Sequence, residues 1–192
     1  MGAMSFAATK GQVAALEKPV RVGSSQMRDI AAVYEACLGD LFGYAASLTR
    51  DHASAEDIVQ EAFTRLVNES VTRHLPENPR AWLYTVTTNL AFSRSRRRAV
   101  ADRWQQLLGR PDRAEAAEAA EATVLRSERH GELNRALGAL PKDHGAALLL
   151  AADGFSGTEI AAILGKSEGA TRNILWRARS ILRDRLQAGE AT

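Results

Sequence analysis

The sequence predicts an all-α fold in which two small helical domains are joined by a flexible acidic linker. Apolar residues recur every three or four positions along most of the 192 residues, the spacing that places them on one face of an α-helix. No stretch shows the alternation of apolar and polar residues that is typical of strands. The helical pattern is interrupted where Gly109 and Pro111 precede a tract of alanine and glutamate, and this interruption divides the chain in two.

These patterns set the domain boundaries. We expect an N-terminal tail over residues 1–26, a first helical domain over 27–103, a linker over 104–128, a second helical domain over 129–187 and a C-terminal tail over 188–192. No apolar run approaches the roughly 20 residues that span a bilayer, and the N-terminus lacks the layout of a signal peptide. We therefore expect a cytoplasmic protein that does not insert into membranes.

The first domain is predicted to hold three helices, of which the first spans about residues 30–48. Its apolar face contains the single cysteine, Cys37, which we expect to be an ordinary core residue. A second helix is predicted to be capped by Ser54. Its buried stripe consists of Ile58, Val59, Ala62, Phe63, Leu66 and Val67, and its other face carries Asp57, Gln60, Glu61 and Thr64.

A third helix is predicted to begin at the Asn78-Pro79 pair, because proline is tolerated in the first turn of a helix. It buries Trp82, Leu83, Val86 and Leu90 and then runs out through the sequence SRSRRR. Residues 40–77 carry seven acidic and three basic side chains, whereas residues 80–103 carry six arginines and one acid. An acidic surface beside a basic one indicates two kinds of partner, one of them a polyanion.

The second domain contains a helix-turn-helix. Ser156 and Glu159 form the pattern of a capping box, Gly165 ends the short helix that follows, and Ser167 caps the next. Two helices joined by so short a glycine-containing turn are typical of DNA-binding proteins. The second helix is expected to point Glu168, Gly169, Arg172, Asn173, Trp176, Arg177 and Arg179 outward, as a recognition helix in a major groove would. A solvated face on a packing helix is the simpler alternative.

Three motifs in this order resemble the extracytoplasmic-function (ECF) sigma factors of bacterial RNA polymerase. SAEDIVQEAFTRLV resembles the polymerase-binding helix of that family, and NPRAWLYTVTTNLAFSRSRRR resembles its promoter-melting helix. A third motif, LGALPKDHGAALLLAADGFSGTEIAAILGKSEGATRNILWRARSILR, resembles its region four. The resemblance covers about residues 28–187.

The resemblance implies roles for these surfaces. Binding to core RNA polymerase would fall to Asp57, Gln60, Glu61, Phe63 and Thr64. The minus-ten promoter element, as single-stranded DNA, would be held by Arg80, Trp82, Asn89, Arg94, Arg96, Arg97 and Arg98. The double-stranded minus-thirty-five element would be read by Ser167, Glu168, Gly169, Arg172, Asn173, Trp176, Arg177 and Arg179. An anti-sigma factor or other regulator is a further expected partner, and no cofactor is implied.

Two other functions are compatible with a helical protein of this size. A di-metal helical bundle is disfavoured because the chain has no Glu-x-x-His pair and its four histidines are scattered. No P-loop, nucleophile elbow or dinucleotide motif is present either, so we expect neither catalytic nor metal-binding residues. A helix-turn-helix regulator that binds DNA alone, with residues 27–103 as a sensing or dimerisation module, is the stronger alternative.

Overall fold

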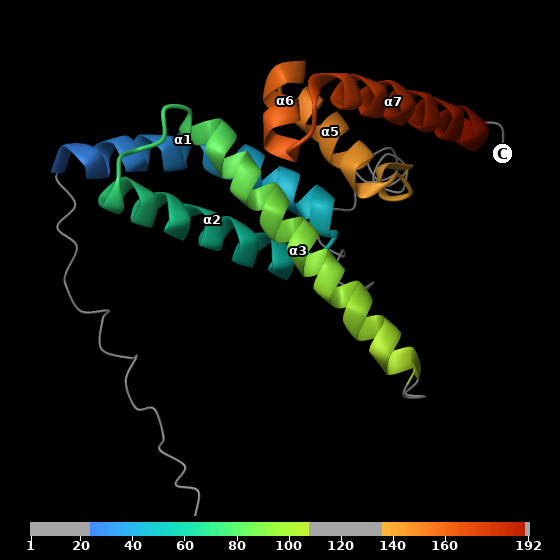
Figure 1. Ribbon diagram of the computed structural model, residues 1–192, viewed down its shortest axis with the longest axis horizontal. Helices are drawn as coiled ribbons and strands as arrows, with labels where there is room; N and C mark the ends of the chain where they lie inside the picture. Colours follow the sequence, from blue (N-terminus) through green and yellow to red (C-terminus); the bar gives the residue numbers. More distant parts are fainter. Residues whose placement is uncertain (1–23, 108–135, 191–192) are drawn as a thin grey trace, which may run out of the picture.

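The computed structural model describes residues 24–107 and 136–190, and all regular secondary structure within these two ranges is helical (Figure 1). The all-α prediction is thereby confirmed. Residues 1–23, which make up most of the expected N-terminal tail, lie outside the described residues. The same holds for residues 108–128 of the expected linker.

The first half of the fold consists of α1 (Ser24–Thr49), α2 (His52–Thr72) and α3 (Pro79–Leu107), which pack against one another. Helix α1 begins three residues before the expected domain boundary, and α3 runs four residues past residue 103. The C-terminal turns of α3 project away from the other helices (Figure 1). Within these turns, the side chains of residues 99–104 are exposed.

The residues that cap the N-termini of α2 and α3 test two of the predicted helix starts. The start of α3 is confirmed, since the Asn78 side-chain oxygen accepts a hydrogen bond from the Ala81 amide at 3.0 Å. The capping role expected of Ser54 is wrong, because α2 begins at His52 with Asp51 as its N-cap residue. The Ser54 hydroxyl instead donates to the Asp51 carboxylate, and this bond holds the pKa of Asp51 below its usual range.

The second half contains α5 (Lys142–Ala152), α6 (Gly157–Leu164) and α7 (Glu168–Glu190). The capping box of Ser156 and Glu159 is present, which confirms the expected start of α6. Gly165 ends α6 with a φ of 62°, a left-handed conformation that glycine adopts without steric cost. The Ser167 hydroxyl oxygen then accepts a hydrogen bond from the Ala170 amide at 3.2 Å and caps α7. The helix-turn-helix prediction is confirmed.

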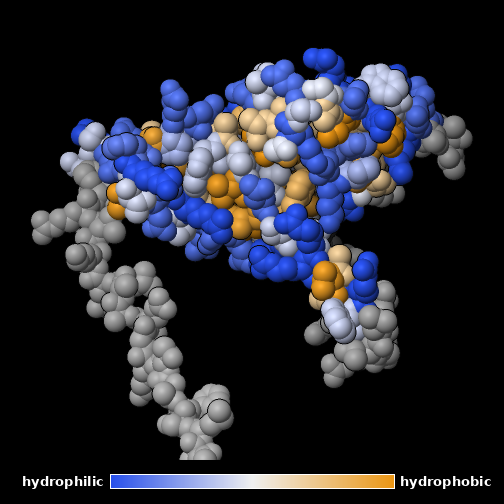
Figure 2. Space-filling view, in the orientation of Figure 1, coloured by the Kyte–Doolittle hydropathy of each residue, from blue (hydrophilic) through white to orange (hydrophobic). Residues whose placement is uncertain are grey.

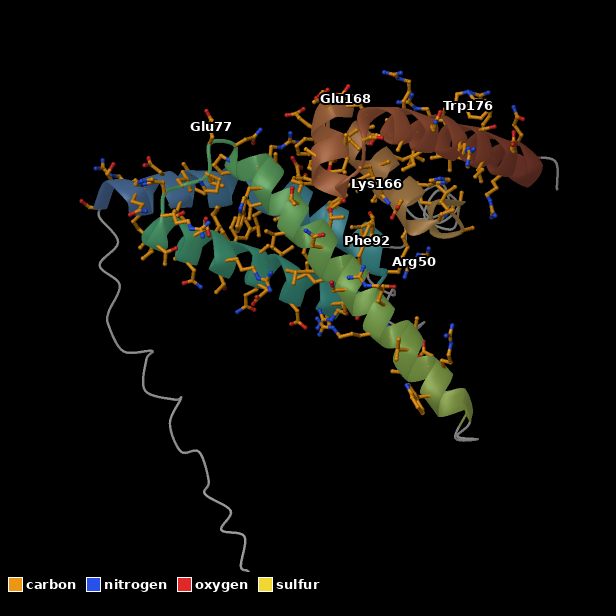
Figure 3. The ribbon with its side chains drawn as sticks, in the orientation of Figure 1. Arg50, Glu77, Phe92, Lys166, Glu168 and Trp176 are labelled. Atoms are coloured by element: carbon orange, nitrogen blue, oxygen red, sulfur yellow. The ribbon has the colours of Figure 1, made fainter. Side chains whose placement is uncertain are left out.

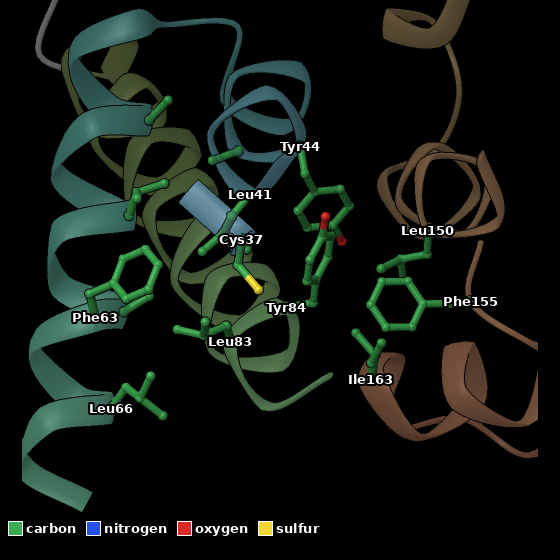
Figure 4. Close-up of a cluster of buried hydrophobic side chains, with 14 of the residues drawn as sticks. Cys37, Leu41, Tyr44, Phe63, Leu66, Leu83, Tyr84, Leu150, Phe155 and Ile163 are labelled. Atoms are coloured by element: carbon green, nitrogen blue, oxygen red, sulfur yellow. The ribbon is translucent and has the colours of Figure 1, made fainter. Parts of the chain in front are cut away.

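The two halves share one hydrophobic core. Tyr84 of α3 lies between Tyr44 of α1 and Phe155 of the turn before α6, with ring centroids 5.0 Å and 4.8 Å away (Figure 4). Leu150 of α5 and Ile163 of α6 belong to the same buried cluster. We refer to this packing of α5 and α6 against α1 and α3 as the closed arrangement.

The closed arrangement corrects the buried stripe expected for α3. Its fully buried residues are Leu83, Tyr84, Thr87 and Thr88, while Trp82, Val86 and Leu90 are only partly buried. The reason is that α3 is covered on two sides, by α1 and α2 on one and by α6 on the other. The helical period, applied to a helix with one buried face, therefore predicts the burial of Leu83 but misses that of Tyr84, Thr87 and Thr88.

Candidate polymerase and nucleic-acid interfaces

The polar face of α2 is exposed as the sequence predicts. The side chains of Asp57, Gln60, Glu61 and Thr64 all lie on the surface. Glu61 accepts a hydrogen bond from Arg65 at 2.8 Å, and the Thr64 hydroxyl donates to the Gln60 carbonyl at 2.8 Å. These two contacts lie along the surface of α2 itself and leave Gln60, Glu61 and Thr64 accessible to a partner.

Phe63 does not lie on that face. Its side chain is only 7% exposed and belongs to the core, with its ring centroid 4.8 Å from that of Tyr34 on α1. A direct contact between Phe63 and a partner protein is therefore excluded in this arrangement. Tyr34, which is 45% exposed, covers Phe63 and is the aromatic ring available to a partner. By spacing, Tyr34 lies on the same apolar stripe of α1 as Cys37, and spacing alone does not distinguish an exposed ring from a buried one.

An ion pair joins the face of α2 to the arginines of α3. Arg94 donates to the Asp57 carboxylate at 2.8 Å and to the Ser54 carbonyl at 3.1 Å. Both side chains of the pair are about half exposed, so water screens their attraction and the pair contributes little to stability. Asp57 was expected to bind polymerase and Arg94 to bind DNA, and here they are bound to each other.

The remaining basic residues near the C-terminal end of α3 are exposed. Asn89, Arg96, Arg97 and Arg98 all lie on the surface, and Arg96 donates to the Ser93 hydroxyl at 3.0 Å. Trp82 is half-buried and packs against the core, so only part of its ring is accessible. This part of α3 therefore offers an amide and three guanidinium groups to a ligand.

Arg80, expected to bind the minus-ten DNA, instead contacts the segment between α5 and α6. Its guanidinium donates to the Asp153 carbonyl at 2.6 Å and lies over the ring of Phe155, 4.2 Å from the ring centroid. A hydrogen bond of this length and a cation–π contact with a buried ring hold the arginine in the closed arrangement. Arg80 is thus not available to DNA here, because α6 and the turn before it cover its side of α3.

The same contact region contains groups with shifted pKa values. Partial burial raises the pKa of Asp153, and burial, with the negative charge of Asp153 nearby, raises that of Tyr84. An acid whose pKa is raised by folding is favoured in its protonated form. Asp153 therefore favours the folded state when protonated, and this contribution is lost as the pH rises through its raised pKa.

The outward face of α7 agrees with the prediction residue by residue. All eight expected positions are exposed: Ser167, Glu168, Gly169, Arg172, Asn173, Trp176, Arg177 and Arg179. Trp176 is 70% exposed and points away from α5 and α6 (Figure 3). The opposite face is anchored by Thr171 and Ala178, which are buried. A shallow hollow of about 310 Å³ lies beside Trp176, between Arg172 and Arg179.

The described residues contain neither a metal-binding cluster nor a membrane-spanning helix. Among residues 24–107 and 136–190, no three histidine, cysteine, aspartate or glutamate side chains lie close enough together to hold a metal ion. Within the same ranges, no helix is both long and apolar enough to cross a bilayer.

Comparison with known sequences identifies both halves. Residues 33–101 match the Sigma-70 region 2 family, and residues 130–182 match Sigma-70, region 4. The ECF RNA polymerase sigma factor SigE of Mycolicibacterium smegmatis is 35% identical over 148 residues, which cover 76% of this chain and 57% of SigE. The chain thus spans little more than half of that relative. The ECF RNA polymerase sigma factor SigL of Mycobacterium tuberculosis is 32% identical over 163 residues, covering 81% of this chain and 88% of SigL.

A solved structure shows the same architecture. The sigma factor RpoE of Bartonella quintana, crystallised with the anti-sigma factor NepR, superposes with a TM-score of 0.66 and 28% sequence identity. The superposition covers 83% of this chain and 98% of RpoE. With both sigma-70 regions present in order, and with a relative such as SigL covered over most of its length, the chain belongs to the ECF RNA polymerase sigma factors.

Proposed function

We propose that the protein is a transcription initiation factor that binds core RNA polymerase, directs it to promoters and assists their melting. The observation that carries this proposal is the segregation of exposed charge. The acidic face on α2 borders an arginine-rich face near the end of α3, which it meets at the Asp57–Arg94 pair, and a second arginine-rich face lies on α7. A protein that joins a basic polymerase surface to two promoter elements needs such a division, because each surface must attract one partner and repel the other.

Each surface is assigned one partner. Core polymerase would bind at Asp57, Gln60, Glu61 and Thr64, the minus-ten element at Asn89 and the exposed arginines of α3, and the minus-thirty-five element at α7. The protein would act in the cytoplasm, where the polymerase and the chromosome are, and would have no catalytic residues of its own. Since RpoE of Bartonella quintana was crystallised with the anti-sigma factor NepR, we propose an anti-sigma factor as a regulator of this protein too.

The proposal is tested against a stand-alone DNA-binding regulator by a gel-shift assay with and without core polymerase. Sigma activity predicts that specific binding to a promoter fragment requires the polymerase. A regulator with its own recognition helix would bind the same fragment without polymerase, as a dimer on two half-sites. Specific binding by the protein alone, unchanged when polymerase is added, would favour the regulator.

Asn89→Ala is expected to impair melting more than recruitment. The Asn89 side chain is exposed on the side of α3 that also carries Arg96, and there an amide can pair with the edge of an unstacked base. Loss of the amide removes that base contact but not the phosphate contacts of the arginines. Permanganate footprinting should show weaker thymine reactivity around the minus-ten element, while gel shifts at low temperature show normal closed complexes. Normal melting in the variant would refute the assignment.

Arg172→Ala and Arg179→Ala are expected to differ. Arg172 lies in the first turns of α7, which enter the major groove in helix-turn-helix proteins, so its loss should cost about 1–3 kcal/mol and relax the preference at one promoter position. Arg179 lies two turns farther along and should act through phosphate, so its loss should reduce the salt slope of binding by about one on all sequences. Binding of the polymerase complex to variant minus-thirty-five duplexes across salt concentrations separates the two effects. Identical losses on every sequence would show that α7 is only a basic patch.

A further inference from the structure

One ion pair joins two surfaces to which different partners are assigned. Asp57 lies on the polar face of α2, and Arg94 lies on α3 among the arginines assigned to DNA. Arg94 donates to the Asp57 carboxylate at 2.8 Å and to the Ser54 carbonyl at 3.1 Å. Figure 2 shows strongly hydrophilic side chains where α3 passes over the N-terminal part of α2. A carboxylate that attracts basic groups and a guanidinium that attracts phosphate are therefore bound to each other.

The orientation of Arg94 follows from the helical period of α3. Leu83, Thr87 and Ala91 are buried and follow one another at intervals of four residues. Arg94 comes three residues after Ala91 and therefore lies on the same side of the helix. This is the side that faces α2, since both hydrogen bonds of Arg94 go to that helix. Arg94 thus lies where the buried side of α3 reaches the surface.

Both members of the pair remain within reach of a partner. The Asp57 side chain is 64% exposed and that of Arg94 is 44% exposed. Water screens the attraction between them, so an exposed pair of this kind changes an equilibrium constant by a factor of at most about five. A partner that forms a stronger contact with either member can therefore replace the other at small cost.

The pair opposes the binding of a phosphate to Arg94. Two oxygens that bond to the same guanidinium lie within about 7 Å of each other, so a phosphate at Arg94 is close to the Asp57 carboxylate. At that distance two negative charges repel each other enough, even in water, to weaken binding about threefold. The same argument holds with the signs exchanged, because Arg94 repels a basic group that approaches Asp57.

We propose that Asp57 and Arg94 are mutual competitors: Asp57 withholds Arg94 from DNA, and Arg94 withholds Asp57 from the polymerase. This inference rests on the proposed function, which assigns these two partners. When a basic group of the polymerase pairs with Asp57, Arg94 loses its charged partner and is available to a phosphate of the minus-ten strand. By linkage, each partner raises the affinity for the other by the same factor, about threefold to fivefold. Arg94 therefore contributes more to DNA binding in the polymerase complex than in the free protein.

Binding of single-stranded DNA by the free protein tests the first half of the proposal. The probe is a short fluorescein-labelled oligothymidine, because phosphate contacts carry no sequence information. Asp57→Asn should raise the affinity about threefold and steepen the log–log dependence on salt by about 0.7, the slope of one added phosphate contact on a single strand. Glu56→Gln is the matched control, because it removes the same charge from the neighbouring residue, which pairs with His52. The control should raise the affinity less and leave the slope unchanged.

A double variant tests whether the effect passes through Arg94. When Arg94 is already replaced by glutamine, Asp57→Asn should change the DNA affinity no more than Glu56→Gln does. An equal gain from Asp57→Asn with and without Arg94 would overturn the proposal. Equal effects of Asp57→Asn and Glu56→Gln in the otherwise unchanged protein would overturn it as well.

Titration of the labelled protein with core polymerase tests the second half. Arg94→Gln should raise the affinity about threefold, since Asp57 then meets the polymerase unpaired. Arg28→Gln removes the same charge from an exposed position of α1, where Arg28 donates to the Ser24 carbonyl of its own helix. It should raise the affinity less. Because the coupling is reciprocal, no gain from Arg94→Gln beyond that of Arg28→Gln would overturn the proposal, even if the DNA titrations agree with it.

The outcomes separate this inference from the proposed function. If the wild-type protein does not bind core polymerase, the proposed function fails. If the wild-type protein binds core polymerase, and Asp57→Asn and Arg94→Gln only match their controls, the competition between Asp57 and Arg94 fails and the proposed function stands.

Discussion

Reversing two carboxylates on α2, with Asp57→Lys and Glu61→Lys together, is expected to abolish stable binding to core polymerase. The proposed function puts these side chains against a basic surface of the polymerase, and two new lysines would meet positive charge there. Like charges brought together in an interface cost several kcal/mol, so affinity should fall roughly a hundredfold or more. The fold should survive, because the reversal breaks only two exposed ion pairs, Asp57 with Arg94 and Glu61 with Arg65.

A titration of fluorescently labelled protein with core polymerase measures this loss, and circular dichroism checks that the helices persist. The matched control is Asp29→Lys with Glu35→Lys, which changes the net charge equally at exposed positions of α1. The control should retain most of its affinity. Equal losses in both variants would mean that overall charge matters rather than the face of α2, and unchanged affinity in the α2 variant would contradict its assignment.

Phe155→Ala is expected to open the closed arrangement as well as to lower stability. The Phe155 ring is buried, lies 4.8 Å from Tyr84 and sits under the Arg80 guanidinium. Removing a buried phenylalanine costs about 3–5 kcal/mol, and here the lost contacts include those that join the two halves. Arg80 would lose its closer ring contact, with Phe155, and keep its hydrogen bond to the Asp153 carbonyl and its contact with the Tyr84 ring. The radius of gyration of the free protein, measured by small-angle scattering, should therefore increase.

Leu41→Ala provides the comparison for this experiment. Leu41 is fully buried in α1, so its truncation should cost about 2–5 kcal/mol without touching the contacts of Arg80 or Phe155. We expect a lower unfolding temperature for both variants but an expanded folded state only for Phe155→Ala. If neither variant expands below its unfolding transition, Phe155 does not hold the two halves together.

The surface of α7 could be predicted fully from the sequence because the helix has a single covered side. Thr171 and Ala178 fix which side packs, and the exposed positions of Arg172 and Trp176 follow from the helical period. The caps at Ser156 and Gly165 could also be predicted, because N-caps and C-caps depend on a few neighbouring residues and favour particular residue types. Helical period and capping preferences therefore suffice to predict the ends of α6 and the exposed face of α7.

The surface of α3 could be predicted only in part. Arg80 and Asp153 are 73 residues apart, and helical periodicity contains no information about a contact across that distance. The pairing of Arg94 with Asp57 could not be predicted for the same reason. It is a tertiary contact between two helices, and the charge of each helix by itself indicates a different partner. Phe63 fits both a buried stripe and the neighbouring polar face by spacing alone, and burial against Tyr34 decides between them.

In vitro transcription with purified core polymerase on a library of randomised promoters is the decisive measurement of sigma activity. Polymerase with this protein should produce transcripts from promoters that share two sequence elements at a fixed spacing, and polymerase alone should produce none of them. Arg172→Ala should relax the sequence preference at the upstream element, and Asn89→Ala should reduce transcription that depends on the downstream one. If the protein binds specific DNA by itself and leaves the transcript pattern of core polymerase unchanged, it does not act as a sigma factor.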